Sequence, residues 1–188
     1  MMKDFYIKNM VCNRCIKVLK NEIEAQEIAV VEIELGRIKL NIKDEKGFTE
    51  FKKIIESNGF KLIDSVEDRL TEQVKIQLIK ILGSLPLDLK GNLSTHLAEI
   101  MHQEYSKVSK VFSATEGMTI EKYFIKLKIE KVKELIEAKV KNFTEISQFL
   151  DYSNINHLSK QFKIETGMNL TDYKFLKNKG RTPLDKII

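Results

Sequence analysis

Hydrophobic residues in the first part of the chain alternate between the period of a strand and the period of a helix. Residues 4–10 read as a short strand, and residues 15–26 then repeat apolar positions at helical spacing. Residues 28–43 alternate apolar and charged side chains on both sides of Gly36 and Arg37, which predicts a β-hairpin with one buried face. On that face the first strand is expected to carry Val31, Ile33 and Leu35.

A second helix and a last strand complete this segment. Residues 48–59 carry an apolar stripe and end at Asn58 and Gly59, which are typical of a helix C-terminus. Residues 60–64 read as a strand, so the predicted order is β-α-β-β-α-β. This order is typical of a ferredoxin-like fold, in which two helices cover a small antiparallel sheet.

From about Val66 onward the chain shows only helical periodicity. Residues 67–82 place apolar side chains on one helix face, and the stretch around Pro86 interrupts the helix. We therefore expect an α+β protein with two domains, residues 1–66 and residues 67–188, of which the second is all-α.

The helical half contains an internal repeat. Residues 109–123 and 159–173 share the pattern S-K-x-F-x4-G-M-x4-Y at an offset of 50 residues. A short amphipathic segment and a brief turn precede each copy, at residues 94–101 and 143–150. The repeat unit is thus helix, turn, helix and glycine, and residues 119–140 predict one long helix between the two units.

The second helix of each unit has an apolar stripe and a polar stripe. In the later copy the apolar stripe consists of Ile155, Leu158 and Phe162, and the polar stripe consists of Asn156, His157, Lys160 and Lys163. In the earlier copy the polar positions are Ser106, Ser109 and Lys110. Asparagine can pair with adenine, and lysine can reach guanine or phosphate, so these faces suit the major groove of DNA.

A solvated face of a helical bundle is the alternative for either helix taken alone. Two such helices at a fixed spacing favour DNA binding over this alternative. A joining helix of roughly 30 Å is close to the roughly 34 Å between successive major-groove faces on one side of DNA. A single chain could therefore place both units on one face of the duplex.

Charge and composition bear on which classes of function the chain can have. The net charge is +5, and most of the excess lies in residues 91–188 with 16 Lys and Arg against 12 Asp and Glu, a weak sign of nucleic-acid binding. No apolar run approaches the roughly 18 residues of a membrane helix, and no secretory signal is present, so we expect a cytoplasmic protein without a membrane partner. Glycine-rich phosphate loops and catalytic triads are lacking, so no enzyme is expected.

The repeat resembles the DNA-binding domain of the AraC/XylS family of bacterial transcription regulators, over roughly residues 68–178. The matching positions are Ile146, Leu158, Ser159, Phe162, Lys163, Gly167 and Tyr173. The chain departs from the family pattern at Asp151 and Tyr152, where Gly-Phe is usual, and at Leu170 and Lys174, where Pro and Arg are usual. The resemblance implies double-stranded DNA and RNA polymerase as partners, with DNA contacts at Ser106, Ser109, Lys110, Ile155, Asn156, Lys160 and Lys163.

The two cysteines of the chain, Cys12 and Cys15, lie at the predicted junction of the first strand and the first helix. Two thiolates make a soft metal site, and a helix N-terminus beside Arg14 lowers the pKa of a thiol. Since no histidine lies in this segment, a tetrahedral zinc site would need further ligands. Metal binding, a redox role and a fold retained without metal all stay open.

Residues 3–65 resemble the heavy-metal-associated domain of copper chaperones and transport ATPases, through the stretches MVCNRC and IIESNGF. The resemblance implies that Cys12 and Cys15 bind Cu(I), or another soft metal, while Met10 packs inward. The chain departs from this family at Asn9, Val11, Asn13 and Arg14.

Two functions follow from these patterns. The first is a sequence-specific transcription regulator, with the thiols as a metal sensor that changes DNA binding. The second is a Cu(I)-handling protein whose helical half binds a protein partner. The repeat favours the regulator, because a carrier has no need of two matched polar helix faces.

Overall fold

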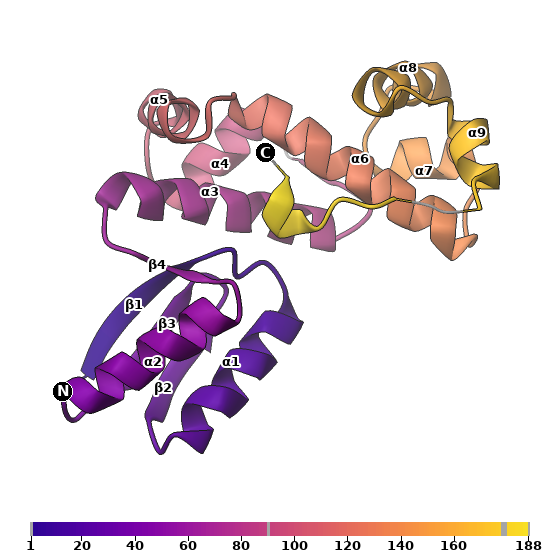
Figure 1. Ribbon diagram of the computed structural model, residues 1–188. Coiled ribbons are helices and arrows are strands. Elements are labelled where there is room, and N and C mark those ends of the chain that lie inside the picture. Colours follow the sequence, from indigo (N-terminus) through magenta and orange to yellow (C-terminus); the bar gives the residue numbers. More distant parts are fainter. Residues whose placement is uncertain (1, 90, 178–179, 188) are drawn as a thin grey trace. The chain divides into compact units, whose positions relative to one another are not determined.

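Figure 1 shows the computed structural model of the protein, which describes residues 2–89, 91–177 and 180–187. The chain forms two compact units, Met1–Ile76 and Gln77–Ile188. The division falls within helix α3 (Val66–Gly83), whereas the sequence places its domain boundary at residue 66. The first turns of α3 are grouped with the N-terminal unit because they carry side chains that contact its sheet.

The N-terminal unit has the predicted order of elements. These are β1 (Met2–Lys8), α1 (Asn13–Ala25), β2 (Ala29–Glu34), β3 (Arg37–Asn41), α2 (Glu45–Ser57) and β4 (Lys61–Ile63). The four strands form one antiparallel sheet in the order β2-β3-β1-β4. The long β1 lies inside the sheet, between β3 and β4.

Alternation along β1 separates the two faces of this sheet. Phe5 and Ile7 belong to the buried cluster formed with α1 and α2, and Met10 is fully buried in the same cluster, as predicted. Tyr6 points to the other face, where the guanidinium carbon of Arg69 lies 4.5 Å from its ring centroid. The beginning of α3 therefore contacts the face opposite α1 and α2.

The hairpin of β2 and β3 is present, but the predicted orientation of Val31 is wrong. A shift of register between Val30 and Glu32 lets Val30 pack against the core, whereas Val31 is 48% exposed. An extra residue in one strand turns the side chains that follow it to the other face. The turn residues are Leu35 and Gly36, so Arg37 belongs to β3.

The second unit is helical, as predicted. It contains the end of α3, then α4 (Leu93–Met101), α5 (Tyr105–Glu116), α6 (Ile120–Ala138), α7 (Phe143–Phe149), α8 (Ile155–Thr166), α9 (Leu170–Phe175) and a short 3-10 turn, Leu184–Lys186. The long helix expected between the repeats is α6. No helix among the described residues combines the length and the apolar character needed to cross a membrane.

Local sequence sets the ends of these helices. Asn92 before α4 and Asn142 before α7 each accept a hydrogen bond from the backbone amide three residues later. Glu145 completes a capping box with Asn142. Gly117 and Gly167 end α5 and α8 in the left-handed conformation, with φ of 68° and 75°.

Candidate functional site

The internal repeat of the sequence is also a repeat of structure. Helices α4 and α7 begin at Leu93 and Phe143, and helices α5 and α8 begin at Tyr105 and Ile155, so each pair keeps the offset of 50 residues. Each second helix is 12 residues long. The chain therefore contains two helix-turn-helix units of matching length, an earlier unit formed by α4 and α5 and a later unit formed by α7 and α8.

An aromatic pair closes each unit in the same way. The rings of Phe112 and Tyr123 meet edge to face with centroids 5.6 Å apart, and those of Phe162 and Tyr173 do so at 5.5 Å. Both phenylalanines are fully buried. Buried pairs of this kind hold each second helix against the helix that follows it, α6 or α9.

The candidate DNA-contacting residues lie on the two second helices. Ser106 and Lys110 on α5 are exposed, and so are Asn156, Lys160 and Lys163 on α8. Ser109 and Ile155 are half-buried. Figure 1 shows α5 near the beginning of α6 and α8 beside its second half. The structure thus divides the predicted residues between two helices of one compact unit.

Two exposed side chains were absent from the predicted set of contacts. Lys107 lies on α5 beside Ser106, and His157 occupies the equivalent position on α8. The His157 ring meets Tyr152 edge to face at 5.3 Å, and its Nδ1 lies 3.2 Å from the Ser153 hydroxyl. The repeat offset, applied to His157, was the signal that could have added both residues.

Tyr152 connects this part of α8 with the middle of α6. The Lys128 ammonium lies 3.9 Å from the Tyr152 ring centroid, which is a cation–π contact. Burial lowers the pKa of Lys128 to about 8, and the charge of Asp151 opposes that shift. Burial, reinforced by the charge of Glu165, raises the pKa of Tyr152. The ring is therefore held neutral between α6 and α8.

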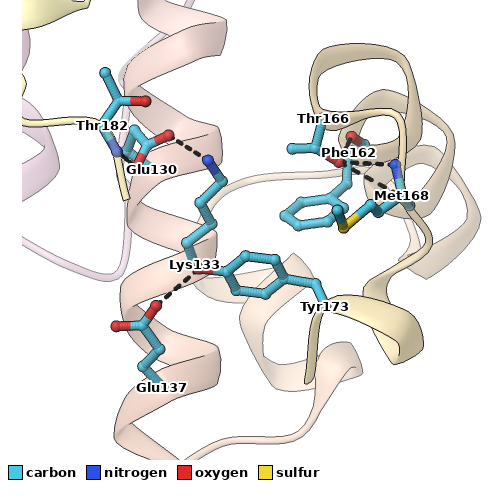
Figure 2. Close-up of polar contacts among 8 residues, drawn as sticks. All are labelled: Glu130, Lys133, Glu137, Phe162, Thr166, Met168, Tyr173 and Thr182. Atoms are coloured by element: carbon cyan, nitrogen blue, oxygen red, sulfur yellow. Dashed lines mark hydrogen bonds and ion pairs between the residues drawn. The ribbon is translucent and has the colours of Figure 1, made fainter. Parts of the chain in front are cut away.

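Further contacts attach the later unit to α6 (Figure 2). The Tyr173 hydroxyl donates to Glu137 over 2.7 Å. Buried Glu130 accepts from Lys133 over 2.6 Å and from the backbone amide of Thr182 over 2.8 Å. The segment around Thr182 is therefore bonded to α6, the same helix against which α8 and α9 pack.

The cysteines occupy the other unit, at the start of α1. Cys12 is the N-cap residue and is exposed, Cys15 is half-buried, and their Sγ atoms lie 2.8 Å apart as free thiols. Burial alone would raise the pKa of Cys12, but the Cys15 thiol and the amides of Arg14 and Cys15 outweigh it and lower that pKa. Burial and the contact with Cys12 raise the pKa of Cys15.

Cys12 and Cys15 are the two cysteines of the chain, so a metal site here has two thiol ligands. Within residues 2–89, 91–177 and 180–187, no three His, Cys, Asp or Glu side chains are grouped so as to hold a metal ion. Two adjacent thiols at a helix N-terminus fit a soft ion of low coordination number and do not complete a tetrahedral zinc site. The loop before them is bonded to α3, since the Asn9 amide donates to Glu72 over 2.9 Å.

Comparisons with known proteins agree with the helical architecture. Residues 97–174 match a protein family described as a helix-turn-helix domain. The C-terminal domain of AraT, a response regulator from Geobacillus stearothermophilus, shares 17% identity over 58% of this chain and 87% of its own, with a TM-score of 0.50.

A second solved structure is similar over a longer stretch. The transcriptional regulator CdpR from Pseudomonas aeruginosa shares 11% identity over 92% of this chain and 55% of its own, with a TM-score of 0.45. None of the curated proteins compared with the chain matches it significantly. The chain thus resembles this helix-turn-helix family over residues 97–174, and the helical unit has a fold like that of the AraT domain.

Proposed function

We propose that the protein is a sequence-specific DNA-binding transcription regulator of the AraC/XylS type. The observation that carries this proposal is the pair of matching helix-turn-helix units, each with an exposed polar helix face, that α6 joins (Figure 1). The family match over residues 97–174 supports it. Under this proposal α5 and α8 enter successive major grooves, and their neighbours contact phosphates.

The dimensions of the unit fit this arrangement. Helix α6 has 19 residues, which corresponds to about 28 Å at the usual rise of an α-helix, close to the roughly 34 Å of one DNA turn. Lys110 and Lys160 supply positive charge at equivalent places on α5 and α8. Asn156 offers the side-chain amide that can pair with adenine through two hydrogen bonds.

Selection from a random DNA duplex library, followed by gel-shift titration of the selected duplex, tests the proposal. We expect one enriched sequence, affinity that falls steeply with salt, and weaker binding by Lys110→Ala and Asn156→Ala variants. Lys53→Ala is the matched control, because Lys53 pairs only with Glu50 inside α2 among the contacts described. No enrichment, or variants that bind like the control, would refute a DNA-reading role.

We also propose that the N-terminal unit is a ferredoxin-like module that makes the regulator responsive to a soft metal ion such as Cu(I). The paired thiols of Cys12 and Cys15 at the start of α1 support this second proposal. So does the hydrogen bond from Asn9 to Glu72, because it connects the loop before the thiols with α3. A bound ion would supply positive charge that two thiolates stabilise.

Titration with Cu(I) and with Zn(II), read by thiol accessibility and by DNA binding, tests the sensor. We expect Cu(I) to protect both thiols and to change DNA affinity, and a Cys12→Ser, Cys15→Ser variant to show neither effect. Equal affinities for metal-free, Cu(I)-treated and variant protein would remove metal control. Cu(I) transfer to an acceptor without any DNA binding would instead identify a metal-handling protein.

A further inference from the structure

The first turn of α6 contacts both of the helices that carry the candidate DNA-contacting residues. Glu121 accepts a hydrogen bond from the Tyr105 hydroxyl at the start of α5. The next residue, Lys122, forms an ion pair with Glu165 near the end of α8, with 2.5 Å between Nζ and Oε1. Two neighbouring residues of α6 are thus bonded to two helices that lie far apart in the sequence.

The ion pair joins the two copies of the repeat. Lys122 belongs to the earlier copy and Glu165 to the later one. The residues at the equivalent positions, 50 away in each direction, are Asp172 and Thr115, so the repeat does not encode the pair a second time. This contact is therefore a difference between the copies, and its effect is to connect them.

The surroundings of both bonds restrict their movement. The side chain of Glu165 is only 11% exposed, so the loss of its ion pair with Lys122 should cost more free energy than the loss of a surface pair. The Lys122 amide donates to the Thr119 hydroxyl over 3.2 Å, which fixes its backbone within the capped first turn of α6. Tyr105 is half-buried, and burial together with Glu121 raises its pKa, so its hydroxyl stays a donor.

We infer that the Lys122–Glu165 pair, together with the Tyr105–Glu121 bond, positions α5 relative to α8 and thereby selects one spacing between the two half-sites on DNA. This inference rests on the proposed DNA-binding function. One added base pair rotates the second half-site by about 34° and moves it by about 3.4 Å. Two helices held in one arrangement meet both half-sites at a single spacing only.

A spacing series measures the predicted selectivity. The selected duplex is altered by removing or adding one base pair between its half-sites, and each form is titrated by gel shift. We expect the unaltered protein to lose about tenfold or more in affinity on either change, and Lys122→Met and Glu165→Gln variants to lose only about twofold. The exchanged pair Lys122→Glu with Glu165→Lys should restore the selectivity, and Lys53→Met should leave it unchanged.

A distance measurement without DNA tests the positioning itself. Ala114 and Ile164 are exposed and equivalent in the two copies, so cysteines introduced there, on a Cys12→Ser, Cys15→Ser background, can carry spin labels. We expect one narrow distance distribution, which Lys122→Met broadens and the exchanged pair narrows again.

The two measurements separate the two proposals. A distribution that Lys122→Met leaves unchanged overturns the positioning role, whatever the protein binds. A broadened distribution with unaltered spacing selectivity overturns the DNA consequence of that role. If the library yields no preferred duplex, the proposed function fails, and the spin-label distances still decide whether the ion pair positions α5 and α8.

Discussion

Helix α5 is attached to the beginning of α6, through the bond of Tyr105 to Glu121 and the contact of Phe112 with Tyr123, whereas the later unit is attached along most of that helix. Glu165 meets Lys122, Tyr152 meets Lys128, and Tyr173 meets Glu137. Helix α5 precedes α6 directly in the chain, so the short connection of residues 117–119 already restricts its position. Helix α8 follows α6 only after α7 and two turns, and the additional contacts restrict its position instead.

The exposed faces of the two units differ as well. Ser106 and Lys107 on α5 correspond to Asn156 and His157 on α8. A serine hydroxyl adapts to several bases, whereas an asparagine amide discriminates adenine through two hydrogen bonds. If the protein reads DNA as proposed, we therefore expect the later unit to do most of the base reading, although the two frameworks are alike.

Removing either buried phenylalanine has the largest expected effect. Phe112→Ala and Phe162→Ala should each cost about 3–5 kcal/mol of unfolding free energy, because each ring is fully buried against a tyrosine. Urea denaturation measures both costs. Phe175→Ala is the control, since Phe175 is 76% exposed, and it should change stability by less than about 0.5 kcal/mol. Very unequal costs for Phe112 and Phe162 would contradict equivalent frameworks.

Replacing the small polar residues tests the difference in base reading. Asn156→Ala should weaken binding of the selected duplex by about 1–3 kcal/mol, and Ser106→Ala by less than about 1 kcal/mol. Gel-shift titration at one fixed salt concentration measures both. Equal losses, or a greater loss for Ser106→Ala, would show that the earlier unit reads the bases.

Half-buried Lys128 on α6 makes the stability of the protein depend on pH. Because the pKa of Lys128 falls to about 8 in the folded protein, the unfolded chain binds more protons above that pH. Stability should rise as the pH increases from about 8 toward the usual lysine value of about 10.4. Thermal melts of the protein and of Lys128→Met measure the difference.

Below pH 8 the Lys128→Met variant should be the more stable protein by about 1–2 kcal/mol, since it removes the desolvation of the ammonium while losing the cation–π contact. The advantage should shrink at higher pH. An advantage that does not change with pH would show that Lys128 titrates normally.

The two glycines that end α5 and α8 give the smallest expected effects. Gly117→Ala and Gly167→Ala should each cost about 1 kcal/mol, because both have positive φ and no atom lies within 4 Å of an added Cβ. Gly83→Ala is the control, since Gly83 is equally open but has no positive φ, and it should not destabilise. Urea denaturation that finds different costs at Gly117 and Gly167 would reveal unequal helix ends.

Periodicity and the internal repeat predicted most of the helical unit. The helices of both copies, the long α6 and the glycine ends appear where the sequence placed them. At two positions where the chain departs from the AraC/XylS pattern, the backbone still has the conformation that the residue usual in that family favours. Asp151 adopts the left-handed conformation with φ of 53°, and the next residue, Tyr152, is buried. Leu170 begins α9, a position that proline also favours.

Contacts between distant segments could not be predicted in this way. The Lys122–Glu165 and Lys128–Tyr152 contacts depend on how α8 packs against α6, and no periodicity within one helix carries that information. The bulge at Val31 was missed because alternation assumes an unbroken register. The DNA-contacting residues and the metal site of Cys12 and Cys15 stay predictions, since their partners are separate molecules.

The turns of the two units differ in length, and the helices compensate. Residues 102–104 separate α4 from α5, and residues 150–154 separate α7 from α8, yet both units run for the same total length because α4 has 9 residues and α7 has 7. The helix starts therefore stay in phase, so residues 105–116 and 155–166 can be exchanged without changing the length of either unit. Such an exchange would move Tyr105 and Glu165 away from Glu121 and Lys122, so the chain would lose both contacts that position α5 relative to α8.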